Sequence, residues 1–209
     1  MRGRHLTRSS APFLIALCAL AAALGPLGCG GGGDSGDAAP RYSGTALRPP
    51  RPAPALALRD SLGRPVNLRQ FRGKAALVTF VYSHCPDVCP LIVSHLKTAQ
   101  AELGRRVRGL QIIAVSTDPR GDTPRAVTGF LKVHGMTGRM LYLLGDRRRL
   151  ERSWRAWDVV ARADPTDPEF VEHSAPVFGI SAGGRLTTVY SPNFRPAQIV
   201  HDVPLLASR

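Results

Sequence analysis

The sequence is poor in lysine, in aromatic residues and in acidic residues, and each shortage narrows what the protein can do. Lysine occurs only at Lys74, Lys97 and Lys132 among 28 basic residues, and aromatic residues make up 6% of the chain. The formal net charge of +13 therefore comes almost wholly from arginine. These arginines are scattered and do not alternate with aromatic residues, which argues against nucleic-acid binding. An acidic membrane surface or an acidic partner fits this charge better.

Several catalytic motifs are also missing. The sequence has no serine nucleophile elbow, no Walker phosphate loop and no helix motif with two histidines, so hydrolase and kinase activities have no support. A peroxidatic cysteine would need threonine and arginine close by, and no such grouping accompanies Cys85. These absences leave thiol chemistry and metal binding as the classes to consider.

The first 28 residues have the build of an export signal. Arginines precede an apolar run over residues 11–24, which is shorter than the roughly 20 residues of a spanning helix. The sequence Leu27-Gly28-Cys29 resembles a bacterial lipoprotein signal, so we expect lipidation at Cys29. Pro26 departs from that motif, and an uncleaved anchor helix is the alternative. Either way, we expect an exported protein of the bacterial cell envelope, tethered to the outer face of the cytoplasmic membrane.

Residues 29–54 predict a tether. They are rich in glycine, alanine and proline and show no apolar periodicity. The glycine-rich half should be flexible and the proline-rich half more extended. The remaining residues, 55–209, are long enough and apolar enough for one folded domain.

The pattern of residues 55–209 predicts an α/β fold. Nearly continuous apolar runs at 75–82 and 110–116 are typical of strands buried on both faces, and each is followed by a predicted helix. This order implies parallel pairing with right-handed crossovers. The other expected elements are a hairpin at 56–68, a strand at 140–144, a helix after Asp146, a loop at 162–172, a hairpin at 177–190 and a helix from Pro196. A thioredoxin-like sandwich with a central mixed sheet and an N-terminal hairpin extension accommodates them all.

Two cysteines, Cys85 and Cys89, follow the first buried strand, and a proline follows each of them. Proline disfavours a helical conformation in the residue before it, so we predict that Pro90 begins the helix and that Cys89 caps it. Cysteines four apart in a regular helix have Cβ atoms about 5 to 6 Å apart, whereas a disulfide needs roughly 3.8 Å. A loop-to-helix hinge would bring them closer. The positive field of the helix N-terminus should favour a thiolate at Cys89 and hence redox exchange or metal ligation.

Three segments resemble the Sco/SenC family of copper-handling proteins of the respiratory chain: residues 78–90, residues 116–124 and Glu172-His173-Ser174. The similarity covers roughly residues 52 to 205, and the cysteine motif is its most specific part. The resemblance implies that Cys85, Cys89 and His173 bind copper, as Cu(I) or Cu(II). Two thiolates and one imidazole suit the soft cuprous ion, whereas structural zinc prefers four protein ligands.

The resemblance also implies a role and partners. It predicts a metallochaperone that delivers copper to the copper centre of a terminal oxidase subunit, with other copper or thiol-redox proteins of the envelope as further partners. The N-terminal anchor would supply the membrane contact. Asp118, at the carboxyl end of a strand, is expected to orient a ligand or contact a partner, and a structural Asp-Pro turn is the alternative. His84 should point away from Cys85, its neighbour in the sequence.

A second function competes with copper delivery. Outside the cytoplasm, Cys85 and Cys89 could alternate between dithiol and disulfide and act on cysteines of an envelope or oxidase partner. Pro176 stands where thioredoxin-like reductases carry a cis-proline facing the cysteines. A cis peptide bond at Pro176 would favour this alternative.

Overall fold

The computed structural model describes residues 41–163 and 171–209. The predicted export signal, the lipidation site Cys29 and most of the predicted tether lie outside these residues. No helix of the described part has both the length and the apolar character needed to cross a membrane.

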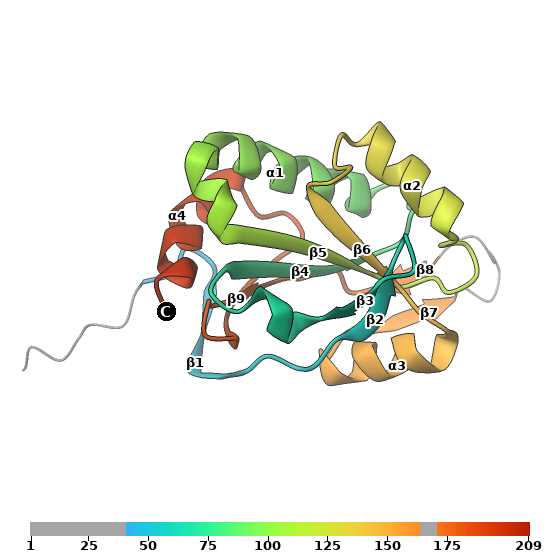
Figure 1. Cartoon of the computed structure of the whole chain (residues 1–209), viewed down its shortest axis with the longest axis horizontal. Helices are drawn as coiled ribbons and strands as arrows, with labels where there is room; N and C mark the ends of the chain where they lie inside the picture. Colours follow the sequence, from blue (N-terminus) through green and yellow to red (C-terminus); the bar gives the residue numbers. More distant parts are fainter. Residues whose placement is uncertain (1–40, 164–170) are drawn as a thin grey trace, which may run out of the picture. The chain divides into compact units, whose positions relative to one another are not determined.

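An eight-stranded mixed sheet forms the centre of the domain, with strand order β1-β10-β9-β4-β5-β6-β2-β3 (Figure 1). The strands β4, β5 and β6 pair in parallel and the other neighbours pair antiparallel, which confirms the predicted thioredoxin-like sandwich. The strands are β1 (Thr45–Pro52), β2 (Ala57–Asp60), β3 (Pro65–Asn67), β4 (Ala75–Val81), β5 (Leu110–Ser116), β6 (Met140–Leu144), β9 (Val177–Ile180) and β10 (Arg185–Tyr190).

Helices cover both faces of this sheet. The apolar residues of α1, α2 and α4 form one core with one face, and those of α3 form a second core with the other (Figure 1). The helices are α1 (Val88–Leu103), α2 (Pro124–Val133), α3 (Arg147–Ala156) and α4 (Pro196–Ala207), with short 3-10 helices η1 (Leu68–Phe71) and η2 (Gly104–Gly109). All seven residues of β4 are buried, as its apolar run predicts.

Two segments differ from their predicted structure. Residues 45–52 belong to the sheet as β1, although composition placed them in the tether. Prolines are tolerated there because β1 is an edge strand, and its pairing with β10 is irregular between Ala46 and Arg51. The segment 162–172 was expected to be a loop, yet its ends form a two-stranded ribbon of β7 (Ala161–Ala163) and β8 (Val171–His173). His173 is the last residue of β8, so this ribbon determines its position.

Candidate metal centre

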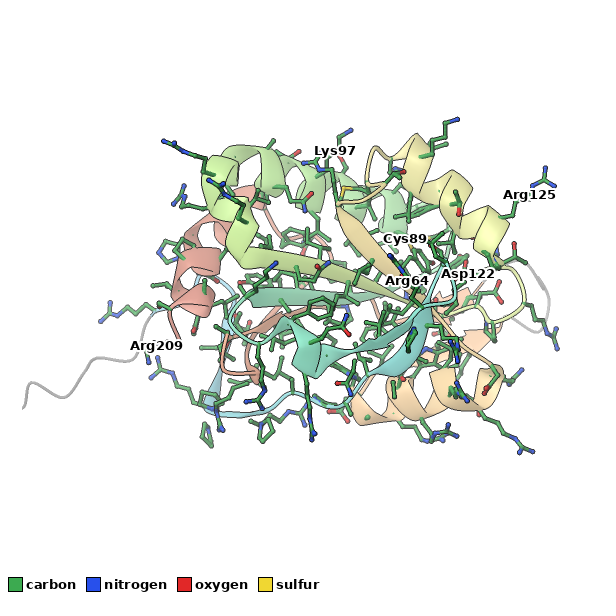
Figure 2. The ribbon with its side chains drawn as sticks, in the orientation of Figure 1. Arg64, Cys89, Lys97, Asp122, Arg125 and Arg209 are labelled. Carbon is green, nitrogen blue, oxygen red and sulfur yellow. The ribbon has the colours of Figure 1, made fainter. Side chains whose placement is uncertain are left out.

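Cys85, Cys89 and His173 meet at the carboxyl end of the central strands. Their ligand atoms, two sulfurs and one imidazole nitrogen, all lie within 4.8 Å of one another. The Sγ atom of Cys89 lies 3.6 Å from the Nε2 atom of His173, although the two residues are 84 positions apart. Both cysteines are buried free thiols and His173 is half-buried. Figure 2 shows Cys89 at this end of the domain.

The start of α1 determines how the two cysteines face each other. The helix begins at Val88, so Cys89 is its second residue and Pro90 its third. The prediction that Pro90 begins the helix was wrong, because amides of the first turn have no partner within the helix and proline loses no hydrogen bond there. The backbone amide of Cys89 instead donates to the Sγ atom of Cys85 at 3.4 Å. The helix N-terminus therefore stabilises a thiolate on Cys85.

The two thiols differ strongly in acidity. A hydrogen bond from the Cys89 thiol lowers the pKa of Cys85 well below its usual value, even though burial of Cys85 acts in the opposite direction. The same hydrogen bond, together with burial, raises the pKa of Cys89. The thiolate predicted for Cys89 therefore belongs to Cys85, with Cys89 as the protonated neighbour.

His173 presents one ring nitrogen to the sulfurs. Its Nδ1 atom lies 3.2 Å from the carbonyl oxygen of Ser174, and because a carbonyl can only accept, Nδ1 carries the proton. The lone pair of Nε2 is then directed at Cys89 and is free to bind a metal. The ring also packs edge-on against Tyr82, with 5.4 Å between the ring centroids. The imidazole is thus held in position on both sides.

The difference in acidity predicts selective alkylation of Cys85. Because the hydrogen bond from Cys89 lowers the pKa of Cys85 to about 3, the Cys85 thiolate should persist at pH values well below the usual cysteine pKa of about 8.5. We expect iodoacetamide to modify Cys85 well before Cys89 in the reduced, metal-free protein, as measured by peptide mass spectrometry. The variant Cys89→Ser serves as the control, since a serine hydroxyl can still donate to Cys85. Faster modification of Cys89 in the wild type would contradict the assignment.

Asp118 lies beside His84 and away from the three donor atoms. Its Oδ2 atom is 3.3 Å from the Nε2 atom of His84, and its carboxylate accepts the amides of Arg120 and Gly121 at 2.9 Å each. By accepting these two amides, the Asp118 side chain stabilises the turn that follows it. Its predicted role toward a metal ligand or a partner stays a prediction.

Asp122 belongs to the segment 116–124 that carries the family resemblance, but the sequence assigned it no role. It is 6% exposed, and its carboxylate accepts hydrogen bonds from the Ser83 amide at 2.7 Å, the Ser116 hydroxyl at 2.6 Å and the Tyr142 hydroxyl at 2.9 Å. Burial raises its pKa. In the sequence it only precedes Thr123, the N-cap of α2, so nothing marked it as a buried group.

Pro176 does not have the geometry expected of a reductase. Within residues 41–163 and 171–209 the one cis peptide bond is Arg48-Pro49, so the Ala175-Pro176 bond is trans and the cis hypothesis was wrong. The Pro176 carbonyl accepts a hydrogen bond from the Thr79 hydroxyl at 3.1 Å, and the next residue, Val177, already pairs with Thr79 in the sheet. Pro176 therefore has a structural place as the residue that leads into β9.

Comparisons with known proteins found a matching family model and similar relatives. The family model described as SCO1/SenC matches residues 48–208. The mitochondrial SCO2 homologue of Bos taurus is 30% identical over 154 residues, which are 70% of this chain and 56% of that protein. The chain thus spans little more than half the length of this curated relative.

Two solved structures are also similar. Apo Sco1 of Thermus thermophilus has a TM-score of 0.70 and 31% identity, and the match covers 79% of this chain and 97% of that one. Bradyrhizobium japonicum ScoI, solved with copper bound, has a TM-score of 0.65 and 25% identity, covering 73% and 97% respectively.

Proposed function

The chain belongs to the SCO1/SenC family, and from this we propose that it is a copper metallochaperone of a respiratory terminal oxidase. Cys85, Cys89 and His173 would hold the copper ion as cargo. The observation that carries the proposal is the convergence of their three donor atoms within 4.8 Å. The copper-bound structure of Bradyrhizobium japonicum ScoI supports it.

The donor set fits copper in its reduced state best. Cu(I) is soft and accepts low coordination numbers, so two sulfurs and one imidazole nitrogen suffice, whereas Cu(II) would need a further ligand or water. A thiolate on Cys85 is ready to bind, and Cys89 would release its proton on binding. Copper uptake should therefore release protons and weaken as the solution becomes more acidic.

Release follows from the difference in exposure among the three ligands. His173 is half-buried, while Cys85 and Cys89 are 7% and 0% exposed. An incoming donor from the recipient can replace the imidazole first, while both sulfurs still hold the ion. The protein would thereby pass copper by ligand exchange without releasing it to water. Its arginine-rich charge of +13 favours an acidic recipient surface.

We also propose an envelope location. The basic, apolar and small-residue pattern of residues 1–28 supports export, and Cys29 would be the lipidated residue that anchors the protein to the membrane. The residues between Cys29 and β1 would tether the folded domain at the outer face of the cytoplasmic membrane, close to a terminal oxidase. Other copper or thiol-redox proteins of the envelope are further candidate partners.

A thiol–disulfide oxidoreductase is the second candidate. The pairing of a Cys85 thiolate with a protonated Cys89 favours it, because such a pair can reduce a partner disulfide. Each cycle would oxidise the Cys85 thiolate and the Cys89 thiol to a disulfide and pass two electrons to the partner disulfide. The proton of Cys89 and one proton from water would complete the two partner thiols. His173 has no required part in that reaction, which separates the two candidates experimentally.

A transfer experiment tests the proposed function. The reduced full-length protein, loaded with Cu(I), is mixed with a metal-free copper-centre subunit of a terminal oxidase, and copper is measured in both after separation. We expect most of the copper to move to the subunit, and His173→Ala to deliver far less because it loads poorly. Absence of Cu(I) and Cu(II) uptake by the wild type would contradict the proposal. Undiminished disulfide reduction by His173→Ala in that case would establish the oxidoreductase instead.

A further inference from the structure

We infer that Asp122 is a positioning residue of the metal centre, whose buried carboxylate holds the turn that carries Cys85 by accepting the Ser83 amide. The inference deepens the proposed function and rests on it where copper affinity is measured. Figure 2 labels Asp122 at the same end of the domain as Cys89.

The hydrogen bonds of Asp122 connect it to three neighbouring strands of the sheet or to the turn that follows one of them. The Ser83 amide lies in the turn after β4, the Ser116 hydroxyl lies at the end of β5, and the Tyr142 hydroxyl comes from β6. All three donors lie within 3 Å of the carboxylate oxygens. Asp122 therefore ties the turn to the rigid centre of the parallel sheet.

The Ser83 bond controls two of the three copper ligands. Ser83 lies within the turn from Tyr82 to Cys85, which is closed by a hydrogen bond from the Cys85 amide to the Tyr82 carbonyl at 3.4 Å. Tyr82 in turn packs edge-on against the ring of His173. Displacement of Ser83 would move the Cys85 sulfur and the ring that supports His173 together.

Ser83 is anchored to the Asp122 carboxylate. Its amide donates to Oδ1 of Asp122 at 2.7 Å, and both the amide and the side chain of Ser83 act to lower the pKa of that carboxyl, against the effect of burial. Removing the carboxylate would leave this amide without its acceptor, which is costly for a partly buried group. The turn would then shift or open to water.

An asparagine at position 122 should preserve this anchor. Its carbonyl oxygen can still accept from the Ser83 amide, and its amino group can donate to the Ser116 hydroxyl. Tyr142 has a second acceptor, since its hydroxyl lies 3.1 Å from the Val81 carbonyl. Asp122→Asn therefore tests whether the site depends on the hydrogen-bond acceptor at this position or on its negative charge.

Asp202 provides a matched control. This aspartate of α4 is fully buried and also accepts from a tyrosine hydroxyl, that of Tyr190 at 2.8 Å. It also accepts backbone amides, from Ser43 at 2.8 Å and Gly44 at 3.0 Å. Its partners belong to the N-terminal segment, to β10 and, through the Nδ1 atom of His201 at 2.6 Å, to α4 itself. Asp202→Ala therefore disrupts a similar network without touching the turn of Cys85.

The experiment compares Asp122→Ala, Asp122→Asn and Asp202→Ala in the full-length reduced protein. Cu(I) affinity is measured by competition with a chromophoric chelator, and amide hydrogen exchange is measured on the metal-free protein. We expect Asp122→Ala to lose copper affinity at least about tenfold and to exchange the Ser83 amide faster. Asp122→Asn should stay within about threefold of the wild type. Asp202→Ala should keep its affinity and show faster exchange only at Ser43 and Gly44.

The copper affinities of these variants can contradict the role of Asp122. Wild-type affinity in Asp122→Ala, or an equal loss in Asp202→Ala, would show that Asp122 does not position the site. If Asp122→Ala does not fold, Asp122→Asn decides: retained affinity with a protected Ser83 amide supports the inference, and lost affinity in the folded variant contradicts it. If the wild type binds no copper, the proposed function fails, while the exchange of the Ser83 amide still tests the anchor.

Discussion

Replacing His173 with alanine is expected to weaken Cu(I) binding by at least about 100-fold, because even the partners that orient a metal ligand cost up to about that factor when removed. The substitution deletes the one nitrogen donor, which β8 contributes, and leaves only the two sulfurs as metal ligands. The measurement is competition between the reduced full-length protein and a chromophoric Cu(I) chelator.

His84→Ala is the matched control for this prediction. His84 is adjacent to Cys85 and packs edge-on against the same Tyr82 ring, with 4.8 Å between the ring centroids. It contacts Asp118 and is not a member of the group of three donors. We expect His84→Ala to stay within about threefold of the wild type, since it removes no donor. An equal loss in both variants would assign the effect to the packing of Tyr82 and would contradict the ligand role of His173.

Oxidation of the protein is expected to abolish copper binding reversibly. A disulfide between Cys85 and Cys89 would consume both sulfur donors and leave one imidazole, which cannot retain copper against a chelator. The two sulfurs lie within 4.8 Å of each other, and this proximity and the thiolate character of Cys85 favour the reaction. Copper bound per chain should fall to background after mild oxidation and return after treatment with a thiol reductant.

Peptide mass spectrometry would locate the disulfide, and Cys85→Ser, which cannot form it, is the control for damage caused by the oxidant. Full copper retention by protein with a mapped Cys85–Cys89 disulfide would exclude the two sulfurs as ligands. Copper loss that the reductant does not reverse would indicate oxidative damage and not reversible disulfide formation. Reversible loss would show that copper loading requires prior reduction of the pair.

The sequence predicted the frame of the domain well, since local patterns determine it. The apolar run of β4 is buried along its whole length, and helices α1 and α2 follow β4 and β5 as the pattern predicted. Strand β1 escaped prediction, because prolines usually exclude a strand and only its place at the edge of the sheet admits them. Such placement depends on tertiary packing, which composition does not reveal.

The site was predictable in part. The spacing of Cys85 and Cys89 marked a pair of reactive sulfurs, but His173 lies 84 residues after Cys89 and only the family resemblance singled it out. The more acidic cysteine was assigned wrongly, because a shift of two residues in the start of α1 changes which sulfur receives the helix amide. Asp122 stood in a segment that resembles the family, but its role could not be predicted, since its buried hydrogen bonds exist only in the folded sheet.

Copper K-edge X-ray absorption of the reduced full-length protein, loaded with Cu(I) and freed of excess metal, tests the central claim most directly. The account predicts about one copper per chain, bound by two sulfurs and one imidazole nitrogen. The nitrogen contribution should disappear in His173→Ala. A protein that retains no copper, or a wild-type copper shell that lacks either sulfur or the imidazole nitrogen, would contradict the assignment of Cys85, Cys89 and His173 as the site of copper transfer.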